Sequence, residues 1–258
     1  MKHVPPKHFG TALKVISAAA ALLYPPRCIL CDELLAPEER AEGICAHCLP
    51  RIPFVGTPFC LRCGKALSHA DAALCRDCET RGSEEREHLF DAGRSLLIYT
   101  EEVSGMISRF KFENRRDIGR RLGAMMACGL RTEIAAMKAN VLVPVPLHPK
   151  KLAERGFDQT ALLAQALAQA WNADRLTVLP LLARNRETRP MNELNSEDRM
   201  RNIAAALSLA PGITGVPERV ILVDDIYTTG STLDACAGVL KRAGVRTVYF
   251  VTAATGMD

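Results

Sequence analysis

The chain carries, at residues 220–232, the run Val220-Ile221-Leu222-Val223-Asp224-Asp225-Ile226-Tyr227-Thr228-Thr229-Gly230-Ser231-Thr232. Its first four residues are apolar and predict a buried parallel strand, after which two carboxylates stand where that strand should end. A hydroxyl-rich loop around Gly230 follows, and residues 233–243 then predict a helix. Open α/β sheets bind their ligands beyond the carboxyl ends of the strands. The run therefore predicts a ligand site at the end of a parallel strand.

The chemistry of this loop favours a phosphorylated ribose. Gly230 lets the backbone approach a ligand closely, and the amides and hydroxyls of residues 228–232 suit a phosphate at a helix N-terminus. Paired carboxylates such as Asp224 and Asp225 can accept hydrogen bonds from ribose hydroxyls. The alternative is a buried strand with an acidic cap before an ordinary helix, which would not require the Thr-Thr-Gly-Ser-Thr loop.

The same run resembles the phosphoribosyl pyrophosphate (PRPP) motif of type I phosphoribosyltransferases. The resemblance implies that Asp224 and Asp225 hold the ribose 2′- and 3′-hydroxyls. It further implies that the 5-phosphate is cradled by Thr228, Thr229, Gly230, Ser231 and Thr232. The signal is specific because the whole run, and not one glycine alone, follows the order of residue types in the motif.

Length, composition and charge limit the possible classes of protein. The chain has 258 residues, which suits one domain of ordinary size and a smaller module. It is 48% hydrophobic and 24% charged, which argues against wholesale disorder. The formal net charge of +4 is too small to argue by itself for nucleic-acid binding. Lysines and arginines nevertheless gather at residues 109–121, 150–155 and 184–201.

Eight of the ten cysteines form four C-x-x-C pairs near the N-terminus, namely Cys28/Cys31, Cys45/Cys48, Cys60/Cys63 and Cys75/Cys78. Their spacings predict tetrahedral thiolate zinc sites. A disulfide framework is the alternative, and it fits poorly because the compartments that hold phosphorylated ribose keep thiols reduced. The sequence leaves open whether neighbouring pairs share a metal, or whether the first pair joins the third and the second the fourth. Cys128 and Cys236 are expected to be small core residues.

The N-terminal part is expected to contain a helix and then the cysteine module. Residues 11–23 are largely apolar, but this run is too short to span a bilayer and has no convincing cleavage site after it. We expect an N-terminal helix over 1–24 that packs or binds a partner, and a cytoplasmic protein without a membrane span. The double C-x-x-C zinc module is expected over 25–80, and the charged residues 79–88 are expected to form a linker.

The remaining chain, residues 90–258, alternates between strand and helix patterns. Strands are expected at 92–99, 141–146, 220–223 and 248–252, and helices at 101–111, 117–138, 159–171 and 233–243. This order predicts an α/β fold with a parallel sheet, flanking helices and right-handed crossovers. By the resemblance above, the sheet is expected to be like that of type I phosphoribosyltransferases, with the small zinc-ribbon-like module preceding it.

Two further segments offer charge to a ligand. Residues 144–159 contain Lys150, Lys151 and Arg155, and a pyrophosphate requires several such cations and close backbone approach. The alternative for this segment is a solvated basic turn. Residues 184–202 form a long polar stretch that is suited to closing over a charged ligand, or else to a loop without a ligand role.

Together these segments resemble the ComF family, in which an N-terminal cysteine zinc module precedes a type I phosphoribosyltransferase domain. The resemblance covers nearly the whole chain and includes Pro25-Pro26-Arg27-Cys28, Phe110-Lys111-Phe112, Arg155-Gly156-Phe157 and Thr188-Arg189-Pro190. It implies that Lys150 and Arg155 contact pyrophosphate. It also implies that Arg189 lies on the closing loop and acts in catalysis with Asp224 and Asp225. Two positions depart from the family pattern. The family usually has Asn where this chain has Asp158, and Gln where this chain has Met191.

The ComF resemblance implies a protein that binds PRPP with Mg²⁺ and acts in DNA uptake, natural transformation or the use of external DNA. Catalysis would be phosphoribosyl transfer to an acceptor that the sequence does not identify. The main alternative is a non-catalytic zinc-containing adaptor for DNA or protein, with a vestigial or sensory PRPP site. Its partner would be a DNA-uptake protein such as a helicase, docked on residues 11–23, or single-stranded DNA, held by Arg109, Lys111, Arg115, Arg116, Arg120 and Arg121.

Overall fold

The computed structural model describes residues 25–69, 71–84, 86–171, 175–185 and 205–258. The chain divides into two compact units, of which one ends at Ile52 and the other runs from Pro53 to Asp258. The helix predicted over 1–24 lies outside the described residues. The domain boundaries expected at 25–80 and 90–258 stay predictions.

The first unit is a small, loop-rich structure around four cysteines. Its described part contains two short 3-10 helices, η1 (Pro37–Glu39) and η2 (Leu49–Arg51). The carboxylate of Glu39 accepts hydrogen bonds from the backbone N–H groups of Ala36 and Ala46 at 2.8 and 2.6 Å. The buried apolar side chains described in this unit are few, as expected for a fold that metal ligation stabilises.

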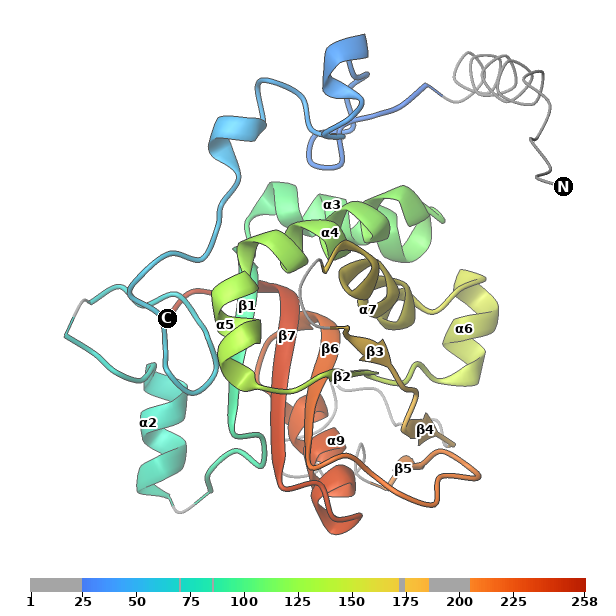
Figure 1. Cartoon of the computed structure of the whole chain (residues 1–258). Coiled ribbons are helices and arrows are strands. Elements are labelled where there is room, and N and C mark those ends of the chain that lie inside the picture. The colour runs from blue at the N-terminus through green and yellow to red at the C-terminus, as the bar shows by residue number, and fades with distance from the viewer. Residues whose placement is uncertain (1–24, 70, 85, 172–174, 186–204) are drawn as a thin grey trace, which may run out of the picture. The chain divides into compact units, whose positions relative to one another are not determined.

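A five-stranded parallel sheet forms the centre of the second unit (Figure 1). Its strands lie in the order β1 (Ala92–Ile98), β7 (Thr247–Thr255), β6 (Arg219–Tyr227), β2 (Val141–Pro144) and β3 (Thr177–Val178). Every neighbouring pair in this sheet is parallel. The side chains of residues 220–223 in β6 are fully buried, which confirms the buried parallel strand and the α/β class.

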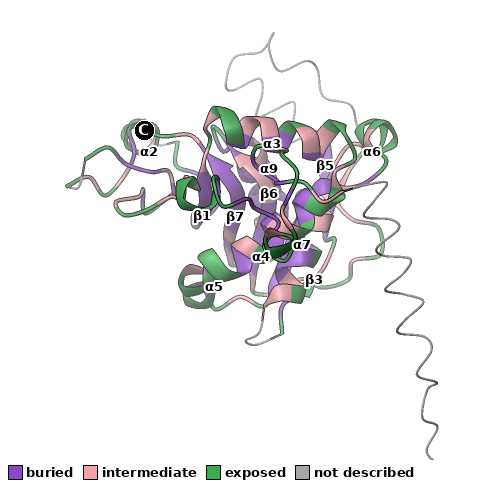
Figure 2. Ribbon diagram, turned by 90° about the horizontal axis from the view of Figure 1, so that it is seen from above, coloured by how far each residue is buried: buried purple, intermediate pink, exposed green. Residues whose placement is uncertain are grey.

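Helices cover both faces of this sheet. α4 (Arg116–Gly129) and α7 (Gln159–Ala170) pack on one face, with α3 (Glu101–Phe112) and α5 (Arg131–Met137) against α4, and α9 (Ser231–Arg242) packs against β7. The crossovers from β6 to β7 and from β2 to β3 run in opposite directions, so right-handed connections place α9 and α7 on opposite faces. Figure 2 shows the buried residues gathered along β6 and β7.

Several elements differ from the sequence-based expectation. The helix expected over 117–138 is two helices, α4 and α5, which meet at Leu130. A short exposed helix that was not expected, α6 (Pro149–Arg155), follows β2. β6 continues past Val223 to Tyr227, because its pairing with β7 extends to Tyr227 and Thr255. The carboxylates Asp224 and Asp225 therefore stand on the strand itself.

The prediction of a linker over residues 79–88 was wrong. α2 (Arg76–Ser83) occupies its first half, and His88 at its end is buried. Charge alone suggested a solvated segment, but two cysteines, Cys75 and Cys78, hold the start of this helix and turn one of its faces inward. The charged side chains of Glu79 and Glu84 remain exposed on its outer side.

A two-stranded antiparallel ribbon lies beside α9. It consists of β4 (Leu182–Arg184) and β5 (Leu207–Leu209), with Arg184 opposite Leu207. Residues 186–204 connect the two strands and lie outside the described residues, and with them Arg189 and Met191. Among the helices in the described part of the chain, none is long and apolar enough to cross a membrane.

Candidate functional site

The predicted site lies between β6 and β2, where the order in which strands are added to the sheet reverses. β6 pairs with β7 as far as Tyr227, but its pairing with β2 ends at Pro144 and Val223. After β6 the chain continues to β7, which lies on one side of β6. After β2 it continues to β3, which lies on the opposite side of this strand pair. Such switch points are where open α/β sheets bind ligands. Asp224 and Asp225 are the first residues of β6 beyond the last pair with β2.

The end of β6 and the residues that follow it line a cavity of about 330 Å³, formed by Asp224 and residues 226–233. Gly230 begins α9 with a φ of 78°, a left-handed conformation that favours glycine. Among the described residues, no side chain caps the first turn of α9, and the hydroxyls of Thr229 and Ser231 lie 3.0 Å apart beside it. The loop therefore offers backbone and hydroxyl donors at the positive end of a helix.

The two carboxylates have different surroundings. Asp224 accepts a hydrogen bond from the backbone N–H of Asp225 at 2.8 Å. Burial raises the pKa of Asp224 to about 7, and the charge of Asp225 adds to this rise against the opposing charge of Lys111. Asp225 itself accepts a hydrogen bond from Nζ of Lys111 at 2.8 Å. Asp225 is therefore paired with Lys111, while the pKa of Asp224 is raised toward neutrality.

Lys111 reaches Asp225 because two short motifs meet beside the site. The Phe110 ring packs against Phe157 with centroids 5.6 Å apart, and the Arg155 guanidinium lies 5.2 Å from the centroid of the Phe112 ring. Phe110-Lys111-Phe112 thus packs on Arg155-Gly156-Phe157. From the sequence, Lys111 lies within a motif of the family resemblance, but its expected role was only in the set suggested for DNA binding. Its partner is 114 residues away, so no local pattern marked it as a residue of the site.

A group of positive charges accompanies the acidic pair, and we call Lys111, Lys151, Arg155 and Arg184 the cation cluster. Burial lowers the pKa of Lys151, and the charges of Arg184, Arg155 and Lys111 lower it further. Burial also lowers the pKa of Arg184, while Cys236 and Asp224 oppose that shift. These like-charge effects indicate that Lys111, Arg155 and Arg184 lie within electrostatic reach of Lys151.

Lys150 and Arg155, the residues expected at pyrophosphate, both lie on α6. The Lys150 side chain is exposed, and its backbone N–H donates to Nδ1 of His148 at 3.2 Å. Arg155 donates to Oε1 of Gln159 at 3.0 Å, which orients its guanidinium at the end of the helix. The structure thus places Arg155 in the cation cluster, together with the neighbouring Lys151.

Asp158, which departs from the usual family residue, is the N-cap of α7. Its Oδ1 accepts hydrogen bonds from the backbone N–H of Ala161 at 3.0 Å and the hydroxyl of Thr160 at 2.8 Å. Asn and Asp cap helices about equally well, so either residue would keep this turn. The difference is electrostatic, because the charge of Asp158 contributes to the raised pKa of Asp224.

The residues suggested for DNA binding do not act as one set. Arg115 forms two hydrogen bonds with the Asp117 carboxylate, both at 2.9 Å. Arg116 donates to Asn114 and to the carbonyl oxygen of Gly156 at 3.0 Å each. Lys111 belongs to the acidic pair, and Arg120 is exposed on α4. Several of these charges are thus engaged within the protein.

The eight paired cysteines form two groups of four. Neighbouring pairs combine, so the first cysteine group is Cys28, Cys31, Cys45 and Cys48, and the second cysteine group is Cys60, Cys63, Cys75 and Cys78. Within each group all four sulfur atoms lie within 4.8 Å of one another. All ten cysteines are free thiols, which argues against the disulfide framework. Cys236 is buried as expected, but Cys128 is exposed, so its assignment to the core was wrong.

The geometry of both groups fits tetrahedral zinc. A zinc–sulfur bond of about 2.3 Å places neighbouring sulfur atoms of a tetrahedron about 3.8 Å apart. The sulfur atoms of Cys31 and Cys45 are 3.7 Å apart, and those of Cys63 and Cys75 are 3.5 Å apart. Although burial opposes ionisation, backbone N–H groups that include that of Cys45 lower the pKa of Cys28 to about 7. The two groups are structural zinc sites.

The chain matches a known zinc family and several competence proteins. Residues 19–79 match the family described as double zinc ribbon domain. Competence protein F of Haemophilus influenzae is 31% identical over 226 residues, which cover 86% of this chain and 93% of that protein. Competence protein ComFC of Bacillus subtilis is 29% identical, with 84% and 89% covered. DNA utilization protein YhgH of Salmonella typhimurium is 29% identical, with 88% and 96% covered.

These relatives align with both the cysteine module and the sheet, because the matches extend over most of each protein. Competence protein F is matched over 93% of its length at 31% identity, which shows common descent. The chain therefore belongs to the family of Competence protein F, the ComF family.

Proposed function

We propose that the protein binds PRPP together with Mg²⁺ at the carboxyl end of β6. The observation that carries this proposal is the cavity that Asp224 and residues 226–233 line together, from the end of β6 to the start of α9. In this arrangement Asp224 and Asp225 accept hydrogen bonds from the ribose hydroxyls, and the residues that hold the 5-phosphate are Thr228, Thr229, Gly230, Ser231 and Thr232. Lys150 and the cation cluster receive the pyrophosphate.

The reaction that fits this ligand is phosphoribosyl transfer. A nucleophile forms a bond to the anomeric carbon as the bond to pyrophosphate breaks, and pyrophosphate leaves with the electron pair. The carboxylates of Asp224 and Asp225 stabilise the positive charge that develops on the ribose ring. Arg189, to which the family resemblance gives a part in catalysis, lies outside the described residues. Mg²⁺ supplies neutralising charge on the pyrophosphate when it is bound.

The relatives support a role in the uptake or use of DNA. Two of them are named competence proteins and a third is named a DNA utilization protein. We propose that this chain acts in the same process, and that it works in the cytoplasm, where reduced thiols persist for thiolate zinc sites. The acceptor of the phosphoribosyl group is not identified by the residues of the cavity.

A second candidate is a non-catalytic adaptor that senses PRPP and contacts single-stranded DNA or a DNA-uptake protein such as a helicase. The observation that favours it is the exposure of Arg116 and Arg120 on α4, in a family whose members are named for DNA. Direct DNA contact predicts that affinity falls steeply with salt and that Arg116→Ala with Arg120→Ala weakens binding. Unchanged affinity in that double variant would remove DNA contact at this face.

The proposed function is tested by calorimetric titration of the zinc-loaded protein with PRPP and Mg²⁺. Saturable binding is expected for the natural protein, and Asp224→Ala with Asp225→Ala should abolish it. Glu101→Ala with Glu102→Ala is the matched control, because it removes two neighbouring carboxylates from the exposed first turn of α3. A folded protein that does not bind PRPP, or a double variant at the site that binds normally, would overturn the proposal.

Once binding is established, pyrophosphate release separates the two candidates. Release that depends on an added nucleobase or other nucleophile supports the transferase. Binding without release from any acceptor, together with retention of DNA or a protein partner, supports the adaptor.

A further inference from the structure

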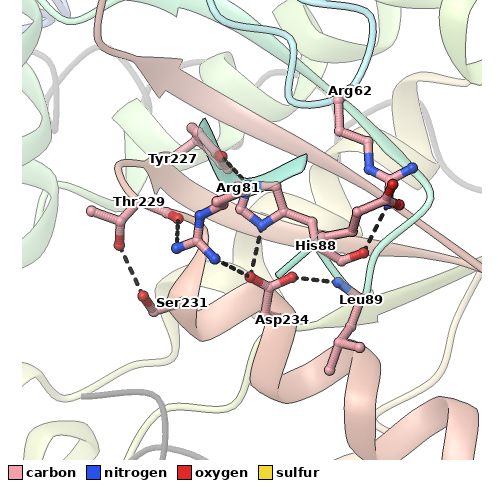
Figure 3. Close-up of polar contacts among 9 residues, drawn as sticks. Arg62, Arg81, His88, Leu89, Tyr227, Thr229, Ser231 and Asp234 are labelled. Atoms are coloured by element: carbon pink, nitrogen blue, oxygen red, sulfur yellow. Dashed lines mark hydrogen bonds and ion pairs between the residues drawn. The ribbon is translucent and has the colours of Figure 1, made fainter. Parts of the chain in front are cut away.

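The loop that begins α9 rests on a polar network from the part of the chain that carries the second cysteine group. This network links α2 and residues 88–89 to the first turns of α9, and Figure 3 shows its members. All of them belong to the unit from Pro53 to Asp258. Neither the zinc module nor the loop at β6, taken alone in sequence, indicates this connection.

α2 is fixed at its start by two cysteines of the second group. Cys75 is its N-cap and Cys78 lies in its first turn. Arg81 follows Cys78 by three residues and thus lies on the same side of the helix, one turn on. The position of the Arg81 guanidinium therefore depends on how the cysteine group holds α2.

Arg81 contacts both the loop and α9. Its Nη2 donates to the carbonyl oxygen of Thr229 at 3.4 Å, and its Nη1 lies 3.8 Å from Oδ2 of Asp234. The Asp234 side chain is 2% exposed, so its charge depends on partners within the protein. Arg81 is one such partner and also holds the backbone of the residue before Gly230.

Asp234, on α9, also bonds to residues 88 and 89. Its Oδ1 accepts the backbone N–H of Leu89 at 2.8 Å, and its Oδ2 lies 2.7 Å from Nδ1 of His88. His88 packs directly under Gly230, since a Cβ at Gly230 would stand 2.9 Å from Cε1 of His88. The loop backbone thus lies on His88 and is held from the side by Arg81.

Tyr227 lies in the same hydrophobic cluster as the second cysteine group. It is buried together with Cys60, Cys63 and Leu233 in one core cluster. Its hydroxyl lies 3.5 Å from Nε2 of His88. The network therefore reaches the second cysteine group in two ways, through Cys75 and Cys78 at the start of α2 and through the core around Tyr227.

We propose that the second zinc site positions the phosphate-binding loop, and that Arg81 is the positioning residue that connects them. The inference rests on the proposed PRPP site and adds a coupling to it: zinc at the second cysteine group strengthens binding at the loop. Because such coupling is reciprocal, a ligand on the loop also strengthens retention of this zinc. We assign no part in this coupling to the first cysteine group, which belongs to the other unit.

The first test compares Arg81→Ala with the natural protein and with Arg76→Ala, which removes an exposed arginine from the same helix. Mg²⁺-PRPP affinity by calorimetry, zinc content and hydrogen exchange of the amides at 228–232 are measured on each. Arg81→Ala should weaken PRPP binding about tenfold, as expected for loss of a charged hydrogen bond, and should speed exchange in the loop. Both zinc ions should remain, and Arg76→Ala should behave as the natural protein. Unchanged affinity and exchange in Arg81→Ala overturn the proposal.

The second test starts from the natural holoprotein, and Cys63→Ser then identifies which of the two ions is protected. A chelator removes zinc in the presence and absence of Mg²⁺-PRPP, and the release of each ion is followed in time. The ligand should slow the release of one of the two ions, and Cys63→Ser should abolish the protected phase. Protection of neither ion, or of both equally, contradicts the coupling. If the natural protein does not bind PRPP, the proposed function fails, but loop exchange after zinc removal still decides whether the site positions the loop.

Discussion

The pKa of Asp224 should make the stability of the ligand-free protein fall with rising pH. The ordinary pKa is 3.8, and burial raises it to about 7 in the folded chain. The folded state then binds the proton more tightly than the unfolded state, so the stabilising contribution is complete below pH 3.8 and is lost as pH rises through about 7.

Urea unfolding of the natural protein and of Asp224→Asn between pH 4.5 and 8.5 measures this effect. The free energy of unfolding of the natural protein should decline relative to the variant over this range, because the amide does not titrate. Parallel pH profiles for the two proteins would show that Asp224 ionises normally.

Lys111 should favour the ionised form of Asp224. Its ammonium group balances Asp225 at 2.8 Å and lowers the pKa of Asp224, so Lys111→Ala should raise that pKa above about 7. The change is read from carboxyl carbon chemical shifts, and PRPP binding should weaken. Lys241→Ala is the control, because it removes a comparable ion pair with Asp91 from a partly exposed position on α9. An unshifted Asp224 in Lys111→Ala would contradict the assigned pairing.

Asp158→Asn should strengthen PRPP binding. The amide keeps the cap of α7 and removes a negative charge that acts on Asp224. Calorimetry should show a several-fold lower Kd, comparable to a change of about 1 kcal/mol in a partly screened charge interaction. A thermal scan checks that the stability of the variant is unchanged, and an unchanged Kd would place the charge of Asp158 out of reach of the ligand.

At the scale of elements, the turn from β6 into α9 has one conformation that glycine alone fills without strain. Ala at a φ of 78° costs about 1 to 2 kcal/mol, and a Cβ at Gly230 would also stand 3.1 Å from the Tyr227 hydroxyl. Gly212→Ala is a matched control, since its φ is 81° and nothing lies within 4 Å of its added Cβ. Gly230→Ala should lose more stability than Gly212→Ala in urea unfolding and should also lose PRPP binding. Equal losses would show that the loop does not rest on His88 and Tyr227.

The strand, loop and helix of this turn were predictable because their signals are local. Residues 220–223 are apolar in a row, Gly230 marks the turn, and α9 follows with helical spacing. The partners of the site were not predictable, since Lys111 is 114 residues from Asp225 and His88 is 146 residues from Asp234. The sequence of α2 is strongly polar, so only its cysteines, read as anchors of a helix, could have shown that residues 79–88 pack inward.

At the scale of the whole molecule, the two cysteine groups have different roles although their spacings are alike. The first lies in the unit that ends at Ile52, while the second lies in the core of the sheet unit. Residues near the second group also bind the end of the chain, where the backbone N–H of Arg76 donates to the Asp258 carboxylate at 3.1 Å and Ala66 pairs with Met257. Zinc in the second group therefore belongs to the stability of the sheet unit itself.

Two equivalent substitutions test this difference. Cys45→Ser and Cys75→Ser each remove the third cysteine of one group and should each lose one zinc ion. The fluorescence of the single tryptophan, Trp171 at the end of α7, reports unfolding of the sheet unit. Cys75→Ser should lower the free energy of this transition by more than about 2 kcal/mol, because a buried metal site and its core contacts are lost together. Cys45→Ser should leave the free energy of this transition unchanged. The zinc ion that Cys45 binds stabilises the other unit, which ends at Ile52. An equal shift in both variants would show that the two units unfold as one, and the ligand-coupled zinc could then not be distinguished by stability.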